Sequence, residues 1–248
     1  MTEKYLTETP ILDFNSRVLQ DLIDARGWRD LDPYDQIGAA YDFVRNEIKF
    51  GYNSSDDIPA SHVLSDGIGQ CNTKTTLLMA LLRGLDIPCK FRGFTIHKSL
   101  QRGVVPELFY PIVPENILHS WVEVLFEEKW IKLEGFILDQ LVLDALQREF
   151  PGQNSLCAYG AGTDCLQSPD VEWKGKDTFI QKTGINQDFG VFDAPDDLYA
   201  DHKQLTGWRG LLYNGIVRHW MNRRVEKIRT GNVPAIPASE ESFEQVVL

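Results

Sequence analysis

The spacing of hydrophobic residues predicts several helices in the first third of the chain. An apolar face over residues 18–23 and a stronger one over residues 33–48, which follow the N-cap Asp32, repeat every three to four positions. Residues 72–85 are apolar around much of the helical circumference, which indicates a helix buried on most sides. Residues 51–70 lie between the helices predicted over 33–48 and 72–85. They are rich in Gly, Asn, Ser and Asp, so we expect a long loop there.

Strand patterns follow the helices. Residues 90–97 alternate as a strand does, and residues 117–136 predict two strands joined by a Glu-Glu-Lys turn. Beyond them the pattern predicts a short helix over 138–150, an irregular but ordered stretch over 151–200 and another helix within 205–229. Helices followed by antiparallel strands are typical of an α+β domain.

The whole pattern predicts one domain over residues 1–230. Its core is expected at about 32–140 and a C-terminal extension at 141–230, with a flexible acidic tail at 231–248. A hydrophobic fraction of 43% with 25% charged residues is sufficient for a packed core and too apolar for a disordered chain.

Acidic residues outnumber basic ones by 36 to 25, which gives a formal net charge of −11. This balance argues against nucleic acid as a partner, because phosphate binding draws on a basic patch. Residues 202–230 are locally basic, and we expect them to pack against the acidic remainder of the chain. No stretch approaches the roughly 18 apolar residues of a membrane span, and the N-terminus lacks a secretory pattern. We therefore expect a cytoplasmic protein without membrane association.

The four cysteines are too sparse for a disulfide scaffold. Cys157 and Cys165 lack the spacing of structural zinc ligands, so no metal and no cofactor is predicted. Cys71 ends the sequence Gly-Ile-Gly-Gln-Cys and stands where the helix over 72–85 begins. A helix N-terminus lowers the pKa of a thiol, which favours a nucleophilic cysteine. The alternative is a core thiol beside a turn.

A nucleophilic cysteine needs a base and an acid that orients this base. His119 opens the first predicted strand and Glu134 lies on the second. A hairpin loop of two or four residues puts Glu134 on the face of His119, one diagonal step away, whereas a three-residue loop puts it on the other face. Glu123 lies too far along the strand, and Asp139 is the reserve acid. A simple cross-strand polar pair is the alternative.

The order of these elements resembles the transglutaminase-like branch of the papain-type cysteine enzymes. The residues that carry this resemblance are 67–94, in which an Arg-x-x-x-Ile-Pro phrase ends the helix at 83–88, together with 119–124 and 130–136. The resemblance implies a papain/transglutaminase-like core, with a cysteine at a helix N-terminus packed on an antiparallel sheet and with extra N- and C-terminal helices.

Carried over residue by residue, the resemblance implies Cys71 as nucleophile, His119 as its base and Glu134 as the acid that holds the histidine. The acid is more commonly Asp in this family, so Glu134 is a departure from the pattern. The implied chemistry is acyl transfer on an amide or peptide bond through a thioester on Cys71.

The tetrahedral oxyanion of such a reaction needs N–H donors. The backbone N–H of Cys71 is the natural first donor, and Gln70, Tyr52 and Asn53 are candidates for the second. Trp121, two residues after the histidine, is a candidate substrate contact.

The predicted partner is a peptide or protein amide. Water as the second nucleophile gives a cysteine peptidase or amidase, and a primary amine as acceptor gives a transglutaminase. A catalytically inactive interaction module that keeps the fold is the alternative of another class.

Overall fold

The computed structural model describes residues 2–204 and 207–236 of the chain. Its helices are α1 (Arg17–Ala25), α2 (Pro33–Asn46), α3 (Ala60–Asp66), α4 (Cys71–Gly84), α5 (Gln140–Glu149), α6 (Pro195–Asp201), α7 (Gly207–Leu212) and α8 (Arg218–Arg229). Its strands are β1 (Lys49–Phe50), β2 (Ile68–Gly69), β3 (Cys89–His97), β4 (Asn116–Phe126), β5 (Lys129–Leu133), β6 (Leu156–Ala158), β7 (Ala161–Thr163) and β8 (Ile185–Phe192). The predicted α+β class is confirmed.

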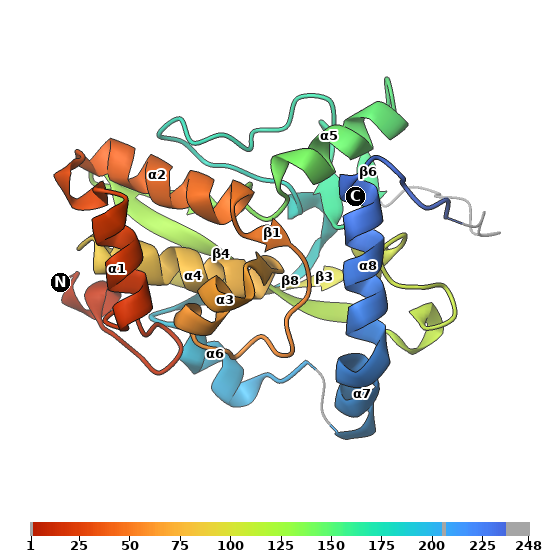
Figure 1. Cartoon of the computed structure of the whole chain (residues 1–248), viewed down its shortest axis with the longest axis horizontal. Helices are drawn as coiled ribbons and strands as arrows, with labels where there is room; N and C mark the ends of the chain where they lie inside the picture. Colours follow the sequence, from red (N-terminus) through yellow and green to blue (C-terminus); the bar gives the residue numbers. More distant parts are fainter. Residues whose placement is uncertain (1, 205–206, 237–248) are drawn as a thin grey trace.

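Helix α4 is the centre of the fold (Figure 1). All its residues are buried, as its apolar circumference predicted, because α1, α2 and α3 contact it on one side and β3 and β4 on another. Thr75 Oγ1 donates to the carbonyl oxygen of Ser120 at 3.2 Å, which ties α4 to β4. A central helix bonded to a sheet in this way holds its N-terminus in a fixed place.

The main sheet has the strand order β5-β4-β3-β8, and all its neighbours are antiparallel. Phe126 pairs with Lys129, so the β4–β5 turn consists of Glu127 and Glu128 alone. Their φ angles of 47° and 64° fit the left-handed pair that a tight two-residue hairpin requires. Of the loop lengths considered above, the structure has the two-residue loop, whose register puts Glu134 on the face of His119.

Strand β8 lies within the stretch that the sequence pattern left irregular. It pairs with β3 at the edge of the sheet, and most of its residues are exposed or half-buried. An edge strand with little burial has no reason to alternate apolar and polar residues, so periodicity did not predict it.

The predicted basic helix forms as α7, a π-helical turn at Tyr213–Val217, and α8. It packs against the body of the chain, as expected, and α8 contacts α5 (Figure 1). Arg229 Nη2 lies 2.7 Å from Oδ2 of Asp139, and both side chains are buried. Tyr159 donates to the carbonyl oxygen of Pro234 at 2.7 Å, so the chain just beyond α8 also contacts the body. The rest of the predicted tail, residues 237–248, lies outside the described residues.

Within the described ranges 2–204 and 207–236, none of the helices combines the length and the apolar character needed to cross a membrane. The same part of the chain holds no group of three or more His, Cys, Asp or Glu side chains arranged for a metal ion.

Candidate active site

Cys71 is the first residue of α4 and is 7% exposed. Before it, Gly69 packs so closely that a Cβ atom there would lie 2.7 Å from Cγ of Lys74, so this position requires a glycine. The N–H of Gln70 donates to Oγ1 of Thr73 at 3.1 Å and caps the helix. These contacts fix the thiol at the N-terminus of a buried helix.

The surroundings of the Cys71 thiol raise its pKa. Burial is the largest cause, and the negative charge of Asp56 is the next. The backbone N–H groups of Asn72 and Cys71 lower the pKa, as the helix start predicted, but they count for less than burial. The prediction of a thiol pKa lowered by the helix is therefore wrong in its net direction. The resting thiol is protonated, and attack on a carbonyl requires a base that removes this proton.

His119 and Glu134 form a buried pair. Nε2 of His119 lies 2.7 Å from Oε1 of Glu134, and neither side chain is exposed. Because a carboxylate only accepts, Nε2 donates its hydrogen and the neutral ring keeps a free lone pair on Nδ1. Nδ1 is buried and has no hydrogen-bond partner among the described residues. The ring is thus held with an unused proton acceptor.

The carboxylate of Glu134 is held by more than the histidine. Its Oε2 accepts from the backbone N–H groups of Ile180 at 2.8 Å and Gln181 at 2.9 Å. The N–H of Glu134 in turn donates to the carbonyl oxygen of Thr178 at 3.0 Å. The segment around residues 178–181, far from Glu134 in sequence, therefore orients this acid.

Asn72 anchors the start of α4 to the strand that carries His119. Its Nδ2 donates to the carbonyl oxygen of Leu118 at 3.1 Å, and its Oδ1 accepts from Oγ of Ser120 at 2.9 Å. These two partners flank His119 in the chain. The charge of Glu134 also contributes to raising the pKa of the Cys71 thiol. The structure therefore brings Cys71, His119 and Glu134 to the same end of α4.

A cavity of about 200 Å³ opens beside Cys71. Tyr52 and Gln70, two of the predicted oxyanion residues, line it with the cysteine. The side chain of Gln70 is already used: Nε2 donates to Asp56 at 3.0 Å and Oε1 accepts from the N–H of Asn53 at 2.9 Å. The hydroxyl of Tyr52 donates to Oε1 of Gln101 at 2.7 Å.

Two further predicted residues lie away from this cavity. Asn53 is fully buried, and its Oδ1 accepts from Oγ1 of Thr73 at 2.6 Å, so it braces the loop before the helix. Trp121 packs on Phe94, with ring centroids 4.1 Å apart, and on Phe179. Neither residue is among the side chains that line the cavity with Cys71.

The polar residues of this cavity that sequence reasoning missed include Asp56, Gln101 and Gln181. Gln101 accepts from Tyr52 through Oε1, and its Nε2 donates to no group among the described residues. Gln181 is 2% exposed, and its buried Oε1 has no partner among the described residues. Each lies in a loop, short turn or irregular stretch without periodicity, so only the fold brings these residues together.

The family comparison identifies one segment of the chain. Residues 25–135 match the model of the transglutaminase-like superfamily. This segment is similar to that superfamily, and we refer to residues 25–135 as the transglutaminase-like core. It contains Cys71, His119 and Glu134, and its match agrees with the resemblance found in the sequence.

The remaining comparisons add two findings. No curated protein matches the chain significantly. A solved structure described as a "putative cysteine protease" from Cytophaga hutchinsonii aligns with a TM-score of 0.43 and 18% sequence identity. The alignment covers 56% of this chain and 43% of that protein, so the two share less than half of that protein's length.

Proposed function

We propose that the protein is a cysteine-dependent acyl-transfer enzyme that acts on an amide or peptide bond through a thioester on Cys71. The observation that supports this most directly is the fully buried His119–Glu134 pair, whose Nδ1 has no partner among the described residues. A buried unused acceptor is costly for stability. Its presence near the first residue of α4 favours a catalytic role over an inactive interaction module.

In the first half-reaction, Nδ1 of His119 takes the thiol proton while Sγ of Cys71 attacks the substrate carbonyl. The C–N bond then breaks, the imidazolium gives its proton to the leaving amine, and the thioester remains. Glu134 keeps the ring oriented and stabilises the imidazolium through its contact with Nε2.

The oxyanion needs donors that are not engaged elsewhere. The N–H of Cys71 is one donor in this proposal. Nε2 of Gln101 replaces the side chain of Gln70 as the second, because the Gln70 amide donates to Asp56 whereas Nε2 of Gln101 has no partner among the described residues. The contact from Tyr52 then holds Gln101 in place.

In the second half-reaction the thioester C–S bond breaks and the thiol regains its proton through His119. Water as the nucleophile releases an acid, and a primary amine forms a new amide. The partner in this proposal is a peptide or protein amide, with water and a primary amine as the two candidate acceptors.

The test is acylation of the protein by p-nitrophenyl acetate, followed by intact-mass measurement and peptide mapping. We expect enzyme-catalysed acylation at Cys71 and its loss in Cys71→Ala, whereas Cys165→Ser, which removes an exposed thiol, should acylate Cys71 as wild type does. Glu134→Gln should lower the acylation rate roughly 10²- to 10⁴-fold, because the amide NH₂ meets either His119 or two backbone N–H donors.

Adding methylamine to the acylated protein separates the two acceptors. N-methylacetamide marks a transferase, and acetate alone marks a hydrolase. Acylation that persists unchanged in Cys71→Ala contradicts the proposed function.

A further inference from the structure

The cavity beside Cys71 has two facing apolar walls. One wall comes from the segment between β3 and β4, and the other comes from the C-terminal helix, beyond the transglutaminase-like core. The first wall includes Phe109, Ile112 and Val113, and the second includes Leu212, Val217 and Met221.

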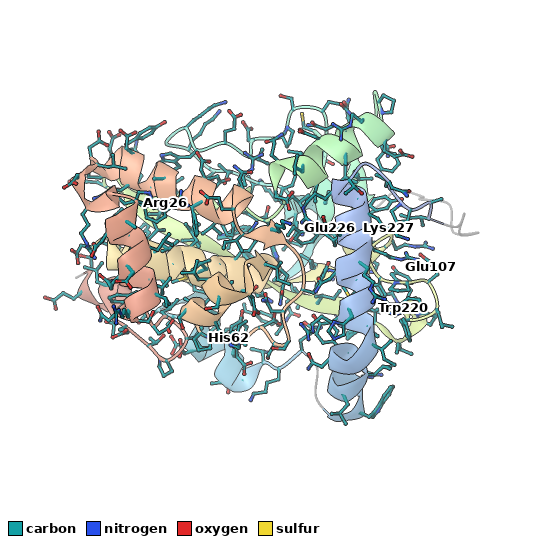
Figure 2. The ribbon with its side chains drawn as sticks, viewed as in Figure 1. Arg26, His62, Glu107, Trp220, Glu226 and Lys227 are labelled. Carbon is teal, nitrogen blue, oxygen red and sulfur yellow. The ribbon has the colours of Figure 1, made fainter. Side chains whose placement is uncertain are left out.

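Contacts between the two segments hold the walls together. The rings of Phe109 and Trp220 lie with their centroids 6.4 Å apart, and Nη1 of Arg224 donates to the carbonyl oxygen of Val105 at 3.4 Å. Figure 2 shows Trp220 on α8 and Glu107 on the facing segment at the same side of the molecule. The two segments therefore contact each other and enclose one cavity.

The cavity has the size for a substantial apolar group. Its volume is about 200 Å³, and an apolar cavity of roughly 150 Å³ is sufficient to bind benzene in another protein. The polar groups that contact a reacting carbonyl in the proposed mechanism, Cys71 and Gln101, line the same cavity. A single substrate can thus place its carbonyl at Cys71 and an apolar chain between the walls.

We infer that the acyl group transferred to Cys71 carries an apolar side chain of leucine or phenylalanine size, which packs between the 109–113 wall and the 212–221 wall. This inference rests on the proposed function. The acyl group is the part of the substrate that stays through both half-reactions. The leaving amine departs in the first half-reaction and the acceptor arrives only in the second, so a contact that lasts through both suits the acyl group.

The test compares p-nitrophenyl acetate with p-nitrophenyl 3-phenylpropionate. In each reaction the ester C–O bond breaks, the S–C bond forms on Cys71 and the thiol proton goes to the released p-nitrophenolate. We expect kcat/KM for the phenylpropionyl ester, corrected for spontaneous hydrolysis, to exceed that for the acetyl ester roughly 10- to 100-fold.

Neighbouring leucines on the helix give a matched pair of variants. Leu212 lines the cavity, whereas Leu211 is 78% exposed and does not. Leu212→Asn should remove most of the preference for the phenylpropionyl ester. Leu211→Asn should leave both rates unchanged. Val113→Asn, on the facing wall, should act as Leu212→Asn does, which guards against a folding defect in one variant.

Two results overturn the inference in different ways. If both esters acylate Cys71 with equal kcat/KM, the assignment of the walls is wrong while the proposed function stands. If neither ester acylates Cys71, the proposed function fails and the inference fails with it.

Discussion

Burial raises the pKa of the Cys71 thiol, and the nearby carboxylate of Asp56 raises it further. Asp56 is held there by Nε2 of Gln70, the residue before the cysteine, and burial raises the pKa of Asp56 as well. The negative charge of Asp56 so close to the Cys71 thiol favours the protonated thiol at rest. In the proposed mechanism, His119 therefore acts as a base in the attack itself, and no thiolate is formed in advance.

Asp56→Asn should make the thiol easier to deprotonate. The variant removes a negative charge that raises the Cys71 pKa, and its amide oxygen can still accept from Gln70. We expect alkylation of Cys71 by iodoacetamide at pH 8 to be roughly 3- to 30-fold faster, because one pKa unit is a factor of ten in thiolate. Peptide mapping over time measures the rate for each cysteine.

Asp57→Asn is the control for this experiment, since Asp57 is exposed and adjacent. In wild type at pH 7, the exposed Cys165 should react faster than Cys71. Rapid labelling of Cys71 that is independent of pH from 5 to 8 would show a preformed thiolate and contradict this view of the site.

At the scale of single residues, sequence reasoning found the features that depend on side-chain type. It missed those that depend on backbone groups or on burial in the folded protein. The pairing of His119 with Glu134 followed from hairpin parity, because a two-residue turn fixes the register of every residue beyond it. The backbone donors at Ile180 and Gln181 were out of reach, since every non-proline residue has an N–H. The burial of Asp56 was equally out of reach, because it depends on the folded loop.

Helix α4 also carries an unusual buried cation three residues after Cys71. Lys74 is fully buried, and its Nζ donates to the carbonyl oxygens of Arg45 at 3.1 Å and Ile137 at 3.0 Å. Burial lowers its pKa to about 7, partly offset by Asp139, while Arg45 and Arg229 lower it further. Asp139 ties α5 to α8 through Arg229, so its carboxylate serves the packing of elements. It is not the acid that holds His119.

Lys74→Met should change how stability depends on pH. In wild type, the unfolded chain binds a proton on Lys74 up to the ordinary pKa of 10.5, whereas the folded chain loses it above about 7. The unfolded state therefore binds more protons between these values, and the free energy of unfolding gains up to about 1.4 kcal/mol per pH unit from Lys74. Below pH 7 the contribution is constant. The variant lacks this gain.

Urea unfolding at several pH values from 6 to 10 measures the effect as the difference between the two proteins. The difference isolates Lys74 from Cys89, whose pKa burial raises to about 11 and whose contribution falls with rising pH in both proteins. Lys49→Met, at an exposed position in β1, should run parallel to wild type. A Lys74→Met curve that also runs parallel would refute the lowered pKa.

At the scale of helices and strands, prediction succeeded for elements whose buried positions repeat with a regular period, on one face or on all sides. Helix α2 and helix α4 have this character, as does the β4–β5 hairpin. Strand β8 failed because its place at the sheet edge is decided by pairing with β3 and not by its own pattern. The π-helical turn at Tyr213–Val217 also has no marker in the sequence, although it brings Tyr213 close enough to donate to the carbonyl oxygen of Asn53 at 3.0 Å.

Across the whole molecule, a locally basic helix closes over an acidic body. Most of the site residues lie in the transglutaminase-like core, whereas one wall of the cavity comes from the C-terminal helix beyond it. This helix is tied to the loop after β1 by a reciprocal pair of hydrogen bonds: the N–H of Tyr52 donates to Oδ1 of Asn222 at 2.7 Å, and Nδ2 of Asn222 donates to the carbonyl oxygen of Tyr52 at 3.0 Å. The predicted single domain over residues 1–230 implies that the C-terminal helix and the core form one structure. Whether they also unfold together in local opening depends on hydrogen bonds such as those of Asn222.

Asn222→Ala should loosen the C-terminal helix while the core stays closed. Loss of two hydrogen bonds of about 1 kcal/mol each predicts a roughly 10- to 30-fold increase in amide hydrogen exchange over 207–229. The amides of α4 should exchange as in wild type, because that helix is fully buried among other elements. Asn232→Ala, an exposed position just beyond α8, is the control. An equal rise in α4 would show that the helix and the core open as one cooperative unit, and no rise in 207–229 would show that the remaining contacts, including Arg229 with Asp139, hold the wall without Asn222.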